Sequence, residues 1–288
     1  MDFLFNKLTD WLKGMLADAC MDNLSGLFDT VNSQVGKVSD VVGMTPSVFS
    51  PEVFQMIRNI SETVIIPIAG LVLTFIACME LIQLIVEKNN LADFDTWIFF
   101  KWVFKTFVAV LLVTNTFTIT MGVFDVAQHV INQSSGLIST KTAIDASSLS
   151  QLRDTLMEKN IGTLLGLYMQ TFLVRSLMYI MSAIIFVIVY GRMIEIYLMT
   201  SLAPIPFSTF GNREQSQIGQ NYLRSLCALA FQGFLILICV GIYAVLIRSV
   251  TFTDKVMVSL WGVVGYTILL TFTLFKTGSL SKSIFNAH

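Results

Sequence analysis

The chain has 288 residues, of which 55% are hydrophobic and only 13% are charged, with a net charge of −1 and a mean hydropathy of +0.73. An ordinary soluble domain carries about 25% charged residues, so roughly half of the usual solvating charge is missing. This composition excludes a soluble enzyme, a disordered chain, and an electrostatic nucleic-acid binder, which would need a basic surplus. We therefore expect an all-α, polytopic integral membrane protein.

Residues 1–62 are predicted to form an amphipathic, extracytoplasmic helical region that does not cross the membrane. Leu8, Trp11 and Met15 share one helical face, whereas Asp10 lies on the other. Such a helix can lie in the lipid interface or pack against sister subunits. Because the net charge of this region is negative, attraction to anionic lipid is unfavourable, and we favour protein contact.

Five apolar stretches within residues 63–277 are long enough to cross a hydrocarbon core of ~30 Å. A polar extramembrane excursion over residues 125–160 separates the second stretch from the third. The third would be about 60 Å long as a helix, and we predict one helix because no turn signal interrupts it. Pro204 and Pro206 end it, since proline cannot continue the hydrogen-bond ladder. The predicted spans are residues 63–86, 97–124, 161–202, 222–247 and 256–275, followed by a cytoplasmic tail over residues 278–288.

The distribution of basic residues predicts how these spans are oriented in the cell membrane. Taken together, residues 87–105, 204–224 and 276–288 carry more basic than acidic residues, whereas acidic residues outnumber basic ones in the segments on the other side. Cytoplasmic segments of membrane proteins carry the excess of Lys and Arg. We therefore expect the N-terminus outside and the C-terminus in the cytoplasm.

Four charged residues lie at or near membrane depth, namely Glu80, Arg175, Arg192 and Glu195. Charged side chains are costly in lipid and should face protein or a wet cavity. Arg192 and Glu195 are three residues apart and can pair within one helix, either as a structural ion pair or as part of the lining of a substrate or proton path. Arg175 has no helical partner, so we take Glu80 as its candidate partner.

The sequence contains no motif for catalysis or for a cofactor. Walker lysine, HExxH and GxSxG patterns are absent, and no carboxylates are paired at catalytic spacing. The four cysteines show no CxxC spacing, and both histidines are isolated, so no metal site is predicted. We therefore expect a protein that is not an enzyme and carries no cofactor.

The stretch Ile184–Leu246 carries the most recognisable pattern of the chain. It consists of a long apolar helix, the segment YLMTSLAPIPFSTF over residues 197–210, a Gln/Asn-rich loop, and a second apolar helix. This pattern resembles the VirB6/TrbL superfamily of conjugative type IV secretion proteins, in the short form found on Gram-positive conjugative elements. The amphipathic N-terminal region and the five spans are similar to the layout of that family.

The resemblance implies an oligomeric, ring-forming scaffold or channel subunit on the path for relaxase-bound single-stranded DNA and protein. Its implied partners are a VirB4-like ATPase, which would supply the energy, VirB3-like and VirB8-like subunits, and transiently the exported DNA. A small-molecule transporter or permease subunit is the alternative. The loop is either a docking site or a solvated linker, and Arg213 and Arg224 are candidates for phosphate contact. The docking candidates are Pro204, Pro206, Arg213, Glu214 and Arg224.

Overall fold

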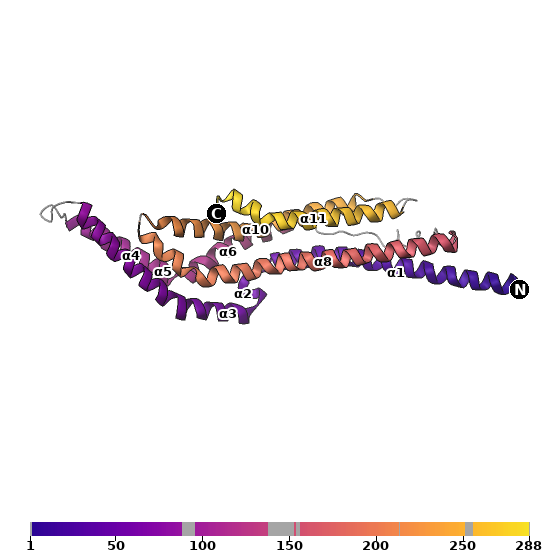
Figure 1. Ribbon diagram of the computed structural model, residues 1–288, viewed down its shortest axis with the longest axis horizontal. Coiled ribbons are helices and arrows are strands. Elements are labelled where there is room, and N and C mark those ends of the chain that lie inside the picture. Colours follow the sequence, from indigo (N-terminus) through magenta and orange to yellow (C-terminus); the bar gives the residue numbers. More distant parts are fainter. Residues whose placement is uncertain are drawn as a thin grey trace. The chain divides into compact units, whose positions relative to one another are not determined.

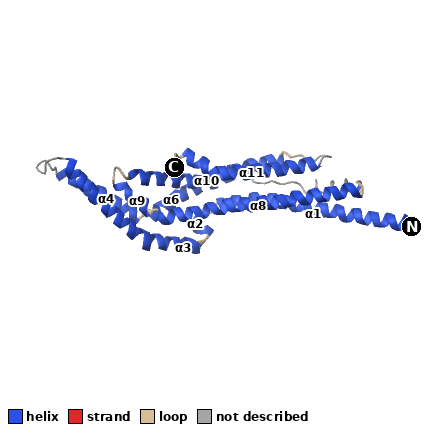
Figure 2. Cartoon of the chain, viewed as in Figure 1, coloured by secondary structure: helices blue, strands red, loops and turns tan. Residues whose placement is uncertain are grey.

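The computed structural model describes residues 2–87, 96–137, 153, 156–212, 214–250 and 256–287. Within these ranges every regular element is a helix (Figure 2). Five helices are long and apolar enough to cross a membrane, which confirms the predicted all-α membrane fold. The elements, several of which are labelled in Figure 1, are α1 (Asp2–Val42), α2 (Pro46–Phe49), α3 (Pro51–Ile60), the π-helix η1 (Ser61–Ile65), α4 (Ile66–Glu87), α5 (Thr96–Thr114), α6 (Thr116–Leu137), α8 (Ile161–Leu202), α9 (Pro204–Ser208), the 3-10 helix η3 (Thr209–Gly211), α10 (Ser216–Arg248) and α11 (Val256–Ile284).

The second apolar stretch is interrupted where the sequence predicts a continuous span over residues 97–124. Helix α5 ends at Thr114, and α6 begins at Thr116. The Asn115 amide donates to the Leu111 carbonyl (2.9 Å), so side chains satisfy backbone acceptors at the break. Side-chain to backbone bonds of this kind compete with the helical ladder. Because α6 continues to Leu137, the first part of the predicted polar excursion is helical.

Other helix ends also differ from the expected bounds. Helices α3, η1 and α4 follow one another without a break, so the first apolar helix extends from Pro51 to Val86. Its start follows from Ser50 at the N-cap and Pro51 in the first turn, where the missing N–H costs nothing. Helix α11 extends to Ile284, so most of the predicted tail is helical. Helix α8 is unbroken from Ile161 to Leu202.

The chain forms two compact units, and the long helices α8, α10 and α11 contribute residues to both. The first unit consists of Met1–Val42, Ser134–Val189 and Ile236–Lys276. The second unit consists of Gly43–Gln133, Tyr190–Leu235 and Thr277–His288.

In the first unit, α1 packs its apolar face against α8. Ala17 and Cys20 form a buried cluster with Leu164 of α8, and the Cys20 thiol donates to the Leu164 carbonyl (3.9 Å). One turn further along, the Asn23 amide donates to the Thr171 hydroxyl (3.4 Å). Over residues 17–42 the apolar face of α1 is thus covered by α8 of the same chain, and contact with sister subunits stays a prediction. The buried apolar residues of α1 are Ala17, Cys20, Leu24, Leu27, Phe28, Val31, Val35, Val38, Val41 and Val42.

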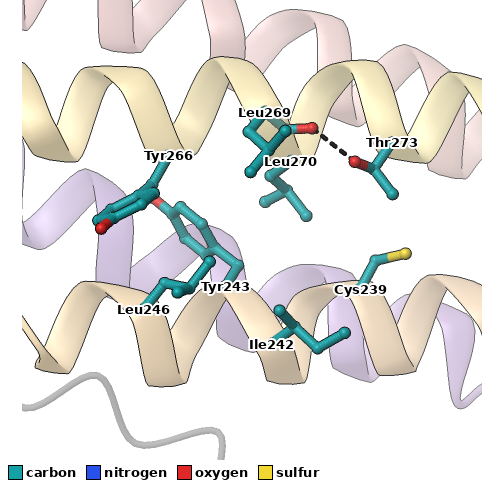
Figure 3. Close-up of a pocket in the computed structure, with 8 residues that line it drawn as sticks. All are labelled: Cys239, Ile242, Tyr243, Leu246, Tyr266, Leu269, Leu270 and Thr273. Carbon is teal, nitrogen blue, oxygen red and sulfur yellow. Dashed lines mark hydrogen bonds between the residues drawn. The ribbon is translucent and has the colours of Figure 1, made fainter.

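Helices α10 and α11 also pack together within the first unit. The hydroxyls of Tyr243 and Thr267 are 2.7 Å apart, and both side chains are buried. Beside them lies a small cavity of about 60 Å³, which Tyr243 and Cys239 of α10 and Leu270 and Thr273 of α11 help to line (Figure 3). The hydroxyl of Thr273 does not enter the cavity as a free group, because it donates to the Leu269 carbonyl of its own helix (2.7 Å).

The burial of Cys20 gives a direct test of the α1–α8 contact. Burial raises the pKa of the Cys20 thiol, so less of it is thiolate at a given pH, and the thiolate is the reacting form. In detergent at pH 7.5 we expect N-ethylmaleimide to modify Cys20 at least about tenfold more slowly than a cysteine placed at the exposed Ser25 of the same helix (Ser25→Cys), as measured by peptide mass spectrometry. Equal rates would show that α1 does not pack on α8 in solution.

Candidate functional site

The proline segment is buried in the second unit and does not form a solvated linker. Helix α9 packs against both α4 and α5. Phe207 is 1% exposed and forms a buried cluster with Ala69 and Leu73 of α4 and Ala109 and Val113 of α5. Helix α8 ends at Leu202, as the prolines predicted, but the segment that follows turns into the protein.

Hydrogen bonds from small polar side chains fix the turn between α9 and α10. The Thr209 hydroxyl donates to the Pro206 carbonyl (2.7 Å) and accepts from the Gly219 N–H (3.0 Å). The Asn212 carboxamide oxygen accepts from the Glu214 N–H (2.7 Å), an Asx contact just before α10 begins. The Tyr222 hydroxyl donates to a carbonyl near the end of α8, at Met199 (2.7 Å).

The two prolines and the polar candidates of the loop lie in different environments. Pro204 is buried and Pro206 is half-buried. Glu214 and Arg224 are exposed, and Arg213 lies outside the described residues. The residues that remain accessible form a docking face at the start of α10, consisting of Glu214, Gln217, Ile218, Gln220 and Arg224.

Glu80 and Arg175 each have other partners in place of the pair that the sequence suggested. Glu80 of α4 pairs with Lys105, which lies on α5. Arg175 of α8 donates to the Asp22 carbonyl (3.3 Å) and to the Asn23 carboxamide oxygen (3.2 Å) of α1. The Glu80–Lys105 pair joins α4 to α5 in the second unit, and the Arg175 contacts join α8 to α1 in the first unit. Each charged side chain therefore has its partner on a neighbouring helix.

Arg175 comes so close to α1 that a glycine is needed opposite it. A Cβ atom added at Gly26 would lie 2.8 Å from the guanidinium carbon of Arg175. The guanidinium also donates to the Tyr179 hydroxyl on its own helix (3.2 Å). Gly26 thus allows the charged head to reach the backbone and side-chain oxygens of α1.

Arg192 is buried and directs its hydrogen bonds to α10. Its Nε donates to the Leu229 carbonyl and its Nη2 to the Ala230 carbonyl, both at 3.3 Å. Gly233 faces the guanidinium, since an added Cβ would lie 2.7 Å from Nη2. The hydrogen bonds of Arg192 therefore join α8 to α10, rather than closing the predicted pair with Glu195 within α8.

Glu195 instead contacts α11, where its carboxylate lies 3.8 Å from the Lys282 ammonium. Both side chains are about half exposed, so this ion pair contributes little to stability. Nearby, Gln232 of α10 donates to the Thr277 hydroxyl (3.4 Å), and the buried Ser281 hydroxyl donates to the Ala228 carbonyl (2.5 Å). The last two contacts join α10 to α11.

Sequence reasoning missed the partners Lys105 and Lys282. A signal for Lys105 was present, because it lies in the helix that follows α4 after a short connection, and adjacent helices usually pack as neighbours. No sequence signal pointed to the carbonyl groups that accept from Arg192. Among the described residues, no group of three or more His, Cys, Asp or Glu side chains could hold a metal ion.

The family model for TrbL/VirB6 plasmid conjugal transfer-like proteins matches residues 31–204. The chain belongs to the TrbL/VirB6 family. The match covers more than half of the sequence, from within α1 to the first proline after α8. No curated protein sequence and no solved structure matches the chain. Members of this family are membrane components of conjugal transfer and are not known to be enzymatic.

Gly219 provides a test of the buried proline segment. A Cβ at Gly219 would lie 2.8 Å from the Pro206 carbonyl oxygen and 3.1 Å from the Phe210 ring. We expect Gly219→Ala to destabilise the detergent-solubilised protein by about 1–3 kcal/mol, measured as a lower thermal midpoint. Gly191→Ala is the matched control, since nothing lies within 4 Å of its added Cβ and alanine favours the helix. An unchanged midpoint for Gly219→Ala would contradict the observed packing of α9.

Proposed function

We propose that this TrbL/VirB6 protein is an oligomeric scaffold or channel subunit of a conjugative type IV secretion system, on the path for relaxase-bound single-stranded DNA and protein. The family match over residues 31–204 carries the proposal. The five apolar helices support it, because they make the chain a multi-pass membrane protein.

The surfaces of the first two apolar helices favour assembly into an oligomer. In the most apolar window of Pro51–Val86 only 17% of the residues are buried within the chain, and in that of Thr96–Thr114 only 11%. In Ser216–Arg248 the share is 50%. Helices with so few internal contacts have surface left for lipid and for other subunits, and helix association in membranes depends on such packing surfaces.

A path for DNA would have to lie between copies of the chain rather than through one of them. The cavity between α10 and α11 has a volume of about 60 Å³ and is lined mainly by apolar side chains such as Ile242, Leu246 and Leu269. It is too small for a nucleotide, and the larger hollow between α4 and α5, of about 380 Å³, is lined mainly by apolar side chains that do not suit a charged strand. A ring of copies around a central opening would provide the space.

The remaining parts of the proposal concern orientation and partners. We place the N-terminus outside and the C-terminus in the cytoplasm, so that the docking face at the start of α10 is available to a cytoplasmic partner. Because the sequence carries no Walker lysine motif, the energy would come from a VirB4-like ATPase, with VirB3-like and VirB8-like subunits in the same complex.

The proposed function is tested by removing the protein from a donor strain. We expect an in-frame deletion to reduce conjugal transfer by at least about a thousandfold, while relaxase nicking at the origin of transfer, an independent reaction, continues. A plasmid copy of the wild-type gene should restore transfer. Normal transfer from the deletion strain would contradict the proposal, whereas uptake of a small solute by the purified protein in liposomes would support the transporter alternative.

The docking face is tested by changing the charge of Arg224. We expect Arg224→Glu to lower the transfer frequency at least about tenfold, because reversing an exposed charge at an interface opposes the encounter with a complementary partner. Arg224→Lys, which keeps the charge, is the matched control and should transfer normally. Immunoblotting must show equal amounts of both variants in the membrane. Normal transfer by Arg224→Glu would exclude an electrostatic role for this face.

A further inference from the structure

Helix α1 presents a continuous polar stripe on the side that faces away from its partner helix. Between residues 16 and 42 every exposed side chain of α1 is polar, whereas the opposite face is buried and almost wholly apolar. Acidic residues outnumber basic ones along the stripe. The exposed residues are Asp18, Asp22, Ser25, Asp29, Asn32, Ser33, Lys37 and Asp40.

Contacts at several levels show that α1 runs parallel to α8, with contacting residues separated by 144 to 152 positions in the chain. Cys20 contacts Leu164, 144 residues further along the chain, and Asn23 contacts Thr171 and Arg175, at separations of 148 and 152 residues. Just after α1, the Pro46 carbonyl accepts from Tyr197, at a separation of 151 residues. Both helices rise 1.5 Å per residue, so a residue of α1 lies level with the residue of α8 about 150 positions later.

The part of α8 beside the second half of α1 has the character of a membrane-spanning segment. Residues 176–191 contain no charged side chain and rise about 24 Å. Arg175 and Arg192 bound this segment. Arg175 contacts the Tyr179 ring, a pairing typical of the membrane interface, whereas Arg192 is buried against α10. Large apolar side chains project outward between them, including Phe186 and Val187, which is 66% exposed.

The other helices of the first unit have the same apolar exterior. Ile242 and Val245 of α10 and Leu269, Phe272 and Phe275 of α11 are all more than half exposed. Water would not stabilise such surfaces, and lipid would. The polar stripe of α1 therefore lies at a depth where the rest of the unit is suited to hydrocarbon.

Charged and amide side chains cannot remain against lipid at that depth without a large cost. At a separation of about 150 positions, Asp29, Ser33 and Lys37 lie level with the segment around residues 179–187 of α8. These positions are within the charge-free segment, too far from either end for every side chain to reach the interface. The exposed polar side chains of the stripe are therefore stable at this depth only in contact with water.

We propose that residues 29–40 of α1 line a water-filled space inside the membrane, enclosed by further copies of this chain, in place of the extracytoplasmic position that the sequence suggested for residues 1–62. The inference rests on the proposed function, since the assembled secretion channel supplies the other walls. Asp29 and Asp40 outweigh Lys37, so a ring of copies gives an acidic wall. A wall of this charge repels the phosphates of a passing strand and does not bind it.

Cysteine accessibility in native membranes tests the proposal. Ser33→Cys places a thiol in the stripe, and Ala183→Cys places one at the same depth on the exposed, apolar side of α8. Each membrane preparation is treated with the hydrophilic reagent sulfonatoethyl methanethiosulfonate, and thiols left unmodified are then counted by polyethylene glycol–maleimide gel shift in SDS. Wild-type protein gives the background from its own four cysteines.

We expect Ser33→Cys to react with the hydrophilic reagent at least about tenfold faster than Ala183→Cys. If Ser33→Cys resists that reagent but reacts with lipid-soluble N-phenylmaleimide, the stripe lies in lipid and the proposal is wrong. If both variants react rapidly with the hydrophilic reagent, the first unit lies outside the membrane and the proposal is also wrong.

The deletion experiment separates this inference from the proposed function. Loss of transfer on deletion together with an unreactive Ser33→Cys overturns the lining of the channel and leaves the function standing. Normal transfer on deletion overturns the function whatever the labelling rates are. Rapid labelling of Ser33→Cys alone, in a protein required for transfer, supports both.

Discussion

A charged side chain within an apolar helix must find its partners on a neighbouring helix, and this constraint accounts for the main helix pairings of the structure. Lys105 joins α5 to Glu80 of α4, Arg175 joins α8 to α1, and Arg192 joins α8 to α10. Apolar packing between helices is weakly directional in lipid, so polar contacts of this kind help to select which helices are neighbours. Glycines opposite Arg175 and Arg192 permit the close approach.

The presence of the apolar helices and the extent of α8 followed from the sequence, whereas several other helix ends and the helix partners did not. The unbroken run of apolar residues over 161–202 and the prolines after it predict a single long helix, because both signals are local. Partner choice depends on which faces meet in three dimensions, so the sequence suggested Glu80 for Arg175, and α1 supplies the acceptors instead. Backbone carbonyls accept from Arg192, and they have no sequence signature at all.

The proline segment shows how one local break produces a tertiary feature. After Pro204 ends α8, the backbone groups that follow cannot bond within that helix. The Thr209 hydroxyl provides partners for two of them, because it donates to the Pro206 carbonyl and accepts from the Gly219 N–H. The short α9 can then insert Phe207 between α4 and α5. The sequence predicted the break but not the burial, because a short loop of mixed polarity is equally compatible with solvent. The polar start of α10 remains exposed on the surface of the chain.

The two faces of the first unit are stable in different environments, one in hydrocarbon and the other in water. The exterior of α8, α10 and α11 is apolar and is stable against hydrocarbon, whereas Asp29 and Lys37 of α1, held at the same level by the register with α8, require water. A lone copy in a bilayer cannot meet both demands, because every exposed face at that depth meets lipid. Several copies arranged with α1 inward meet both, since each copy then shields its neighbours' polar stripe. Under this proposal, the polar stripe of α1 belongs to the interior of an assembly.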